Sequence, residues 1–132
     1  MGLSISGAVK KTDIPATTIR YYDKKGLLPF VRHDENGHRD FTKHDITMLQ
    51  LISCLKNTGM ELSHIRDFVQ MCQDGDTTLE ERLALFEHQK TVIEDRIKQD
   101  QKYLQTVEHK INYYKAACAA GTEDAVSNED CE

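Results

Sequence analysis

The fold is decided by residues 16–29, which read ATTIRYYDKKGLLP. The first ten of these residues include no Gly or Pro, and Gly26 follows them. Glycine commonly ends a helix because it adopts the left-handed backbone conformation without a steric penalty. Lys24 and Lys25 fall in the last turn, where cations complement the helix dipole. The stretch therefore predicts a helix over residues 16–25 that stops at Gly26.

A second short helix is predicted immediately upstream. Ile5, Ala8 and Val9 have the i, i+3, i+4 spacing of an apolar helix face, which indicates a helix over residues 4–11. Residues 12–15 (TDIP) interrupt it, and the proline suits the first turn of the next helix because its missing N–H would have no helical partner there. Two short helices joined by a tight turn predict a helix-turn-helix.

Residues 27–41 predict a small two-stranded wing. Short apolar-polar stretches lie at residues 27–32 and 38–41, on either side of Asn36-Gly37. Asn-Gly is typical of a type I′ hairpin turn, in which both central residues need positive φ. We therefore expect a hairpin centred on this pair.

Two more helices are predicted to complete the N-terminal part. Thr42 and Asp45 have the spacing of a capping box, so a third helix should begin there and end near Gly59. A fourth helix is predicted over residues 61–71, followed by a loop at residues 73–77 that is rich in Asp and Gly. The residues expected to face inward are Ile46, Leu49, Ile52 and Leu55 on the third helix and Leu62, Ile65, Phe68 and Val69 on the fourth.

From Leu79 onward the apolar spacing becomes the alternation of four and three residues that is typical of a coiled coil. No Gly or Pro occurs between Gly75 and Gly121, so one continuous helix is expected. An intramolecular hairpin is the alternative, but the chain has no breaker at which to turn. The seam positions are Leu79, Leu83, Phe86, Lys90, Ile93, Ile97, Asp100, Leu104, Val107, Ile111, Tyr114 and Cys118.

Such a seam is too long to be buried against the preceding residues, so it requires a second chain. Lys90 and Asp100 interrupt it, and polar residues in a seam often fix register or orientation. We therefore expect an antiparallel coiled-coil homodimer. The residues predicted to form its interface are Leu83, Phe86, Ile93, Ile97, Leu104, Val107 and Ile111.

The distribution of charge separates the two ends of the chain. The net charge is −5, which by itself argues against binding to nucleic acid. Residues 1–45, however, contain eight Lys or Arg and six Asp or Glu, so the acidic excess lies entirely in the remainder. A mildly basic head with an acidic body suits a domain that faces phosphates.

The second predicted helix carries side chains suited to DNA. A recognition helix inserts its N-terminal residues into the major groove, and Thr17 and Thr18 offer hydroxyls there. Arg20 offers a planar guanidinium that binds phosphate through two N–H groups. Tyr21 and Tyr22 combine packing rings with hydroxyls, and at least one of them is expected to fill the core. The candidate contacts in the wing are Arg32, His38 and Arg39.

These motifs occur in a specific order between about Ser4 and Gln73. They are TIRYYD at residues 18–23, GLLP at residues 26–29 and NGHR at residues 36–39, with Ile5, Phe41 and Gly59 around them. The series resembles the head of the MerR family of transcription regulators, and the long helix resembles that family's dimerisation helix. The family usually has Gly in the turn where this chain has Asp13, a residue that tolerates the left-handed conformation better than most.

The resemblance implies a mainly α fold, and the chain is expected to have three parts. A winged helix-turn-helix DNA-binding domain would cover residues 1–75 and a dimerisation helix residues 76–119. The third part, residues 120–132, lies outside the resemblance, and its acidic, aperiodic composition predicts a disordered tail. The resemblance also implies that the homodimer binds a palindromic operator in double-stranded promoter DNA, with RNA polymerase on the same promoter. A signal would make the dimer bend and untwist the DNA so that transcription begins.

The signal is the part that the sequence leaves open. The stretch CLKNTGM at residues 54–60 resembles the small NmlR/AdhR-like subgroup, which responds to aldehyde and thiol stress. In that subgroup the cysteine at the position of Cys54 is the proposed sensor, whose thiolate adds to an electrophile. An inert, packed cysteine is the alternative, since free cysteines are among the most buried residues.

Other functions are weighed against this one. A metal-responsive regulator would use Cys118 and Cys131, whose spacing does not match the family's metal loop. A coiled-coil adaptor that binds protein through its head is a second alternative. No catalytic motif, cofactor site or CxxC pair occurs, so neither an enzyme nor a cofactor is expected. No signal peptide or apolar membrane span is found, so a cytoplasmic location without membrane contact is expected.

Overall fold

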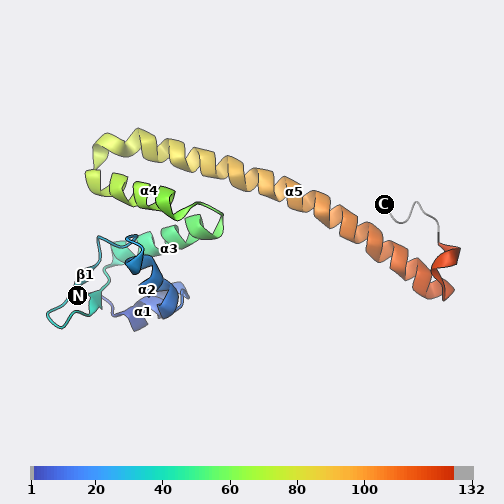
Figure 1. Ribbon diagram of the computed structural model, residues 1–132, viewed down its shortest axis with the longest axis horizontal. Coiled ribbons are helices and arrows are strands. Elements are labelled where there is room, and N and C mark those ends of the chain that lie inside the picture. Colours follow the sequence, from blue (N-terminus) through green and yellow to red (C-terminus); the bar gives the residue numbers. More distant parts are fainter. Residues whose placement is uncertain (1, 127–132) are drawn as a thin grey trace. The chain divides into compact units, whose positions relative to one another are not determined.

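The structure, a computed structural model, describes residues 2–126 and is mainly helical (Figure 1). Among these residues, no helix combines the length and the apolar character that a membrane span requires. The elements are α1 (Ile5–Thr12), α2 (Ala16–Lys24), β1 (Arg32–His33), β2 (Arg39–Asp40), α3 (Lys43–Asn57), α4 (Leu62–Asp74), η1 (Asp76–Thr78), α5 (Leu79–Ala120) and η2 (Glu123–Ala125).

The chain divides after Phe86 into two compact units. The first unit, called the head below, contains α1 to α4, the β1–β2 wing and the first two turns of α5. The second unit contains the rest of α5 and η2.

The helix-turn-helix forms within one residue of its predicted bounds. Ser4 caps α1 by accepting a hydrogen bond from the backbone N–H of Gly7 at 3.3 Å. Asp13 ends α1 in the left-handed conformation, with φ of 59°, which confirms that an aspartate can occupy the position of the family's glycine. At the end of α2, Gly26 has φ of 79° and Leu27 donates to the carbonyl of Tyr22 at 3.0 Å, which is a Schellman motif.

The wing is a two-stranded antiparallel hairpin, but its turn differs from the predicted one. Arg32 faces Asp40 and His33 faces Arg39 across the hairpin. Among the described residues, only Asp13 and glycines have positive φ, so Asn36 lacks the conformation that a type I′ turn requires. The loop instead spans residues 35–37 and takes its positive φ, 81°, at Gly37 alone.

Hydrogen bonds from Asp34 are the physical reason for this longer loop. Its Oδ1 accepts from the backbone N–H groups of Asn36 and His38, both at 2.9 Å. Its backbone N–H donates to the carbonyl of His38 at 2.7 Å, and its carbonyl accepts from Gly37 at 3.0 Å. The aspartate thus satisfies the loop backbone, which a two-residue turn would not need.

Helix α3 begins and ends as predicted. Thr42 Oγ1 accepts from the backbone N–H of Asp45 at 3.1 Å, and Asp45 Oδ2 accepts from the backbone N–H of Thr42 at 2.9 Å, which completes the capping box. Gly59 follows its last turn with φ of 95°, and Met60 donates to the carbonyl of Leu55 at 3.0 Å. A second Schellman motif therefore turns the chain into α4.

Helix α4 is longer than predicted, because it continues through Asp74. The expected loop at residues 73–77 shrinks to Gly75, whose φ of 91° stops the helix, and the short helix η1 follows. Thr78 stabilises this arrangement, since its Oγ1 donates to the carbonyls of Met71 at 2.7 Å and Gly75 at 2.8 Å.

The core of the head lies where α1 to α4 and the wing meet. Six of the eight residues predicted to face inward from α3 and α4 are buried, while Ile46 and Leu62 are half-buried and Met48 is buried instead. Phe68 of α4 also packs edge-on against Phe86 of α5, with ring centroids 5.2 Å apart. The largest fully buried side chains are Phe41, Ile19, Leu27, Leu28, Leu49, Ile52, Leu55, Ile65 and Val69.

Helix α5 runs for 42 residues without interruption, as predicted. At its C-terminal end Tyr113 is buried and its hydroxyl donates to Glu123 Oε1 at 3.1 Å. Thr122 accepts from the backbone N–H of Asp124 at 3.2 Å and begins η2. The tail was expected to be disordered from residue 120, whereas these contacts order residues 120–126. The expected disorder of residues 127–132 lies outside the described residues.

Candidate nucleic-acid interface

Helix α2 presents one face to the core and the other to solvent. Ile19 and Tyr22 are buried, with exposed fractions of 0% and 3%, so one of the two tyrosines fills the core as expected. Thr17, Arg20 and Tyr21 are exposed on the opposite side, and Thr18 is half-buried between the two. The solvent side of α2 is therefore a row of hydroxyl and guanidinium groups, which is the chemistry that binds phosphates and base edges.

The exposed tyrosine of α2 is held by its neighbours. The ring of Tyr21 lies 6.3 Å from that of Tyr22, and the ammonium of Lys25 lies 5.7 Å from the Tyr21 ring centroid. These contacts orient the ring while 43% of the residue stays exposed. Tyr21 is thus an exposed ring that its neighbours support.

An ion pair joins the wing to α2. Arg39 Nε donates to Asp23 Oδ2 at 2.7 Å, and His33 Nε2 lies 4.0 Å from the same oxygen. Arg39 is consequently half-buried rather than free on the surface. The sequence shows Asp23 only as part of the TIRYYD motif. It does not predict this role, because the partner Arg39 is distant along the chain.

The wing tip carries a carboxylate whose charge is stabilised locally. The backbone N–H of His38, together with that of Asn36, holds the pKa of Asp34 below its ordinary value, and partial desolvation opposes this effect. The His38 ring nitrogen Nδ1 lies 3.6 Å from Asp34 Oδ2 and its side chain is 76% exposed. His38 therefore extends from a loop whose backbone is already hydrogen-bonded.

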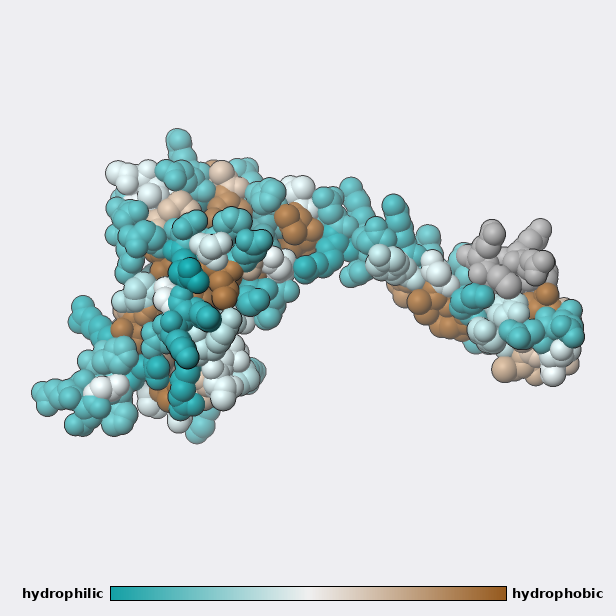
Figure 2. All heavy atoms as spheres, in the orientation of Figure 1, coloured by the Kyte–Doolittle hydropathy of each residue, from teal (hydrophilic) through white to brown (hydrophobic). Residues whose placement is uncertain are grey.

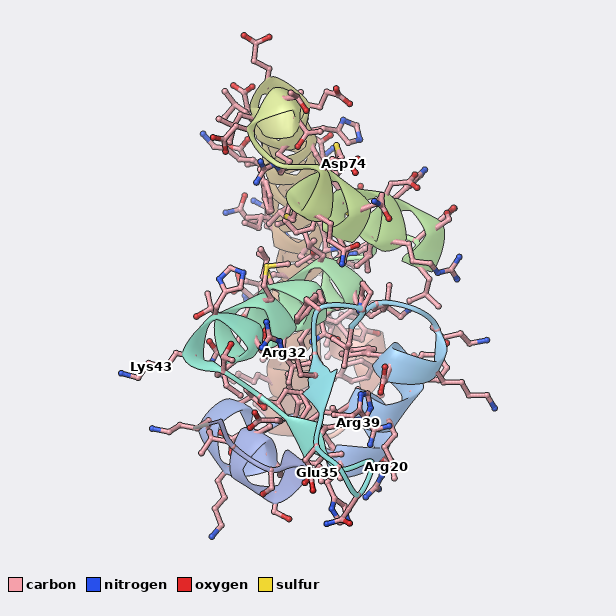
Figure 3. All side chains as sticks on the ribbon, turned by 90° about the vertical axis from the view of Figure 1, so that its left-hand side faces the viewer. Arg20, Arg32, Glu35, Arg39, Lys43 and Asp74 are labelled. Atoms are coloured by element: carbon pink, nitrogen blue, oxygen red, sulfur yellow. The ribbon has the colours of Figure 1, made fainter. Side chains whose placement is uncertain are left out.

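The remaining candidates lie on the same part of the head. Arg32 is exposed on β1, as the predicted DNA contact requires. In Figure 3 Arg20 and Arg39 lie toward the wing end of the head, whereas Asp74 lies at the other end. Arginine side chains of α2 and the wing thus lie at one end of the head, together with the acidic Glu35 of the wing loop.

A residue of α4 completes the support of α2. Arg66 Nε donates to the carbonyl of Lys25 at 2.7 Å, which satisfies a carbonyl at the C-terminal end of α2. A guanidinium there also complements the helix dipole. No sequence signal identified Arg66, since its partner is 41 residues away.

Three cysteines lie within the described residues. Cys54 on α3 and Cys118 on α5 are exposed, whereas Cys72 on α4 is half-buried with Arg82 Nη1 at 4.0 Å from its sulfur. In this chain Cys54 is therefore not the packed core cysteine that was the alternative interpretation. Within residues 2–126, no group of three or more His, Cys, Asp or Glu side chains is placed to hold a metal ion. Cys131, the other cysteine of the metal hypothesis, lies outside the described residues.

The predicted interface residues of α5 differ in their exposure. Ile93 is half-buried, and Phe86 is half-buried against Phe68 of the same chain. Figure 2 shows a hydrophobic strip along the C-terminal half of α5. The apolar α5 residues that are 48% to 60% exposed are Leu79, Leu83, Ile97, Leu104, Val107, Ile111, Tyr103 and Tyr114, of which all but Tyr103 are seam positions.

Comparison with known proteins agrees with this geometry. The MerR HTH family of regulatory proteins matches residues 3–72. An uncharacterized HTH-type transcriptional regulator of Haemophilus influenzae is 44% identical over 127 residues, which is 96% of this chain and 94% of the relative. The HTH-type transcriptional regulator AdhR of Bacillus subtilis is 31% identical over 80 residues, which is 61% of this chain and 57% of AdhR.

Solved structures show the same fold. HiNmlR, described as a MerR family regulator lacking the sensor domain and bound to promoter DNA, superposes with a TM-score of 0.89 at 44% identity and 96% coverage of both chains. A MerR family regulator from Bacillus thuringiensis superposes with a TM-score of 0.79 at 36% identity, over 84% of this chain and 97% of that one.

The winged helix-turn-helix, with the exposed hydroxyl and guanidinium groups of α2 and the arginines of the wing, defines a DNA-binding transcription regulator. The chain belongs to the MerR family of HTH regulators. This family consists of transcription regulators rather than enzymes, as expected, and membership sets aside the hypothesis of a protein-binding adaptor.

Proposed function

We propose that the chain acts as a homodimer that binds a palindromic operator in a promoter and activates transcription by distorting the DNA between the promoter elements. RNA polymerase would occupy the same promoter. The observation that carries the DNA-binding part is the ion pair of Arg39 with Asp23, because it joins the two elements expected to contact DNA into one surface.

On this proposal α2 enters the major groove and the wing contacts the adjacent backbone. Thr17, Thr18 and Arg20 reach the groove and its phosphates from α2, while Tyr21 contacts the backbone through its hydroxyl. The proposed wing contacts are Arg32, His38 and Arg39. Tyr22 was also a candidate, but its burial favours a role in packing, and a direct contact through it stays a prediction.

The homodimer is supported by the exposed stripe of α5. Five aliphatic side chains on this helix beyond Leu79 are about half exposed in the single chain. An apolar seam of this length is costly to leave in water, since each fully buried aliphatic side chain contributes about 1.5–3 kcal/mol. Pairing with a second copy would bury the stripe, and two heads on one dimer would match the two halves of a palindrome.

The signal is proposed to act through Cys54. HiNmlR, which is similar over nearly its whole length, is described as lacking the sensor domain. If this chain is organised in the same way, its signal must be detected in the head or the dimerisation helix. Cys54 is exposed on α3, whose buried face forms part of the head core, so addition of an electrophile to its thiolate could alter how the head packs.

Binding to DNA is tested with a gel shift on the DNA upstream of the chain's own gene, at several salt concentrations. A regulator that binds phosphates loses affinity steeply as salt rises, with a logarithmic slope of about −0.9 per phosphate contact. Specific binding should exceed binding to a scrambled sequence by at least about 10³-fold. Equal affinity for both sequences would contradict operator recognition.

Sensing is tested with a reporter driven by the same promoter, challenged with formaldehyde, other aldehydes, oxidants and metals. Cys54→Ser should retain DNA binding and lose activation by aldehyde. Cys118→Ser is the matched control, because it also removes an exposed thiol and should respond normally. Normal activation of Cys54→Ser would refute the sensor assignment, and loss of a metal response in Cys118→Ser would favour the metal hypothesis.

A further inference from the structure

Two charged residues interrupt the apolar stripe of α5, and they restrict how two copies can pair. Lys90 and Asp100 occupy seam positions of the four-and-three alternation, and both are exposed. Within the described part of the chain, neither of them forms an ion pair. Each therefore places a hydrated charge among apolar seam residues, and a second helix that covers the seam would remove water from it.

We propose that α5 pairs with a second copy of itself in the antiparallel register that places Lys90 opposite the partner's Asp100. By symmetry the same register places Asp100 opposite the partner's Lys90, so the dimer holds two such pairs. This inference rests on the proposed homodimer and goes beyond it by fixing the alignment of the two helices.

The register follows from the spacing of the seam. In an antiparallel pair of identical helices, each step forward along one helix is a step backward along the other. Two residues that face each other therefore lie at equal distances from a common midpoint, on opposite sides of it. A midpoint at Asp95 brings Lys90 opposite the partner's Asp100 and Ile93 opposite the partner's Ile97.

The same midpoint pairs the rest of the stripe without a mismatch. The seam residues that follow outward are Phe86 opposite the partner's Leu104, Leu83 opposite the partner's Val107, and Leu79 opposite the partner's Ile111. Every apolar seam residue between Leu79 and Ile111 thus faces another apolar residue. The stripe and the two charges are satisfied by one alignment.

The neighbouring antiparallel registers leave charges among apolar side chains. A shift of one heptad in either direction would place Lys90 opposite the partner's Ile93 or the partner's Val107. Asp100 would correspondingly face the partner's Leu83 or the partner's Ile97. A charge buried without a counter-ion is strongly destabilising. In a buried ion pair, the attraction between the two charges approximately offsets the free energy lost when both lose their hydration.

A parallel pair in register is disfavoured by the same argument. It would place Lys90 beside the partner's Lys90 and Asp100 beside the partner's Asp100. Like charges that face each other in a helix pair repel. The sign pattern of the seam therefore favours the antiparallel orientation as well as the register.

The register has a consequence for DNA, because it sets how far apart the starts of the two α5 helices lie. The two copies of Leu79 would be separated along the pair by the 32 residues that lead to Ile111, or about 48 Å at 1.5 Å per residue. A slip of one heptad would change this separation by about 10 Å, which corresponds to about three base pairs at 3.4 Å each. Half-site spacing in the operator therefore depends on this pair.

The test is a charge-reversal cycle on the full chain, with dimer affinity measured by sedimentation equilibrium at low salt. Lys90→Glu and Asp100→Lys should each weaken dimerisation at least about tenfold, because each creates two like-charged contacts in the seam. The double variant restores opposite charges at both contacts and should recover the affinity of the unsubstituted chain to within about threefold.

The matched control reverses two charges outside the seam. Asp95→Lys combined with Lys98→Glu exchanges exposed charges on α5 and should leave the dimer unchanged. The register is wrong if the double variant loses as much dimerisation free energy as the two single variants together. It is also wrong if neither single variant changes the dimer affinity. A monomeric unsubstituted chain would refute the homodimer itself, which distinguishes the two failures.

Cross-linking gives a second readout that does not depend on the charges. In a Cys118→Ser background, Leu83→Cys with Val107→Cys should form disulfide-linked dimers on mild oxidation, because these positions face each other. Leu83→Cys with Tyr114→Cys, which would face each other after a slip of one heptad, should link poorly. The reverse pattern would overturn the proposed register, since disulfides form only at close Cβ distances.

Discussion

Arg39 in the wing and Asp23 on α2 form a charge-assisted hydrogen bond of 2.7 Å, although sixteen residues separate them in sequence. Both side chains are largely protected, with exposed fractions of 25% and 22%. Because Arg39 lies on β2 and Asp23 near the end of α2, the bond holds the wing against the recognition helix. The two elements also share the buried core of the head, and this bond adds a direct polar contact between their solvent-facing sides.

Loss of this bond should weaken DNA binding without removing a phosphate contact. We expect Asp23→Asn to lower operator affinity severalfold and to leave the slope of log affinity against log salt unchanged, since it removes no cation from the interface. Arg39→Ala should lower affinity and also reduce the magnitude of that slope by about 0.9, if Arg39 itself neutralises one phosphate. Gel shifts at several salt concentrations measure both quantities.

A double-mutant cycle separates positioning from direct contact. The coupling between Asp23 and Arg39 should contribute about 1 kcal/mol to the free energy of unfolding. Asp23→Glu, which retains the charge, should recover part of the DNA affinity. Asp23→Asn affinity equal to that of the unsubstituted chain would show that the wing needs no such support.

The sequence was informative where local chemistry determines the structure. The capping box of Thr42 and Asp45 and the glycines that end α2 and α3 act within one turn of a helix, so spacing alone predicts them. The Asn-Gly pair was misleading because the carboxylate of Asp34 competes for the same backbone N–H groups and favours a longer loop.

The parts of the site that the sequence did not predict depend on tertiary contacts. The bonds of Arg39 to Asp23 and of Arg66 to the end of α2 join residues far apart in the chain, so no periodicity reports them. Phe86 illustrates the same limit, because its heptad position predicts a dimer contact but says nothing of the edge-on contact with Phe68 that the fold adds. Spacing identifies a face, and only the fold determines what covers it.

Asp13 offers a test of backbone strain in the turn of the helix-turn-helix. It is the one non-glycine among residues 2–126 with positive φ, at 59°. Asp13→Gly should therefore be neutral or stabilise the chain by up to about 1 kcal/mol, whereas Asp13→Ala should destabilise it by about 1 kcal/mol. Urea denaturation at one fixed protein concentration measures both changes. A stabilising alanine would contradict a left-handed conformation at this position.

The carboxylate of Asp34 at the wing tip should change its protonation state only in acid. The pKa of Asp34 is lowered in the folded state by backbone N–H donors, chiefly that of His38. A depressed pKa contributes stability that is fully present above the unfolded value and is lost as pH falls through the folded one. Ionisation of Asp34 should therefore leave the amide chemical shifts of Asn36 and His38 unchanged from pH 8 to about pH 5. These shifts should respond to protonation of Asp34 only in more acidic solution.

Asp34→Ala provides the control for this titration. It removes the acceptor of both amides, so their acid-induced shift should disappear and the loop should exchange its amide hydrogens faster. A titration of these amides at or above the ordinary carboxyl pKa, lost in Asp34→Ala, would contradict the lowered pKa of Asp34.

Phe86 and Leu104 should separate the stability of the head from that of the dimer. Phe86 lies on α5 but packs edge-on against Phe68 of the head core, whereas Leu104 is 56% exposed in the single chain. Phe86→Ala should destabilise the head itself by about 2–3 kcal/mol, because it removes a partly buried ring and leaves a gap beside Phe68. Leu104→Ala should weaken only the pairing of two chains, so its effect should vary with protein concentration.

Hydrogen exchange at the buried amides of Ile65 and Val69 distinguishes the effects of the two substitutions, because it should accelerate in Phe86→Ala even at concentrations where the dimer is saturated. Equal acceleration in Leu104→Ala under those conditions would mean that the head and the dimer helix unfold as one cooperative unit.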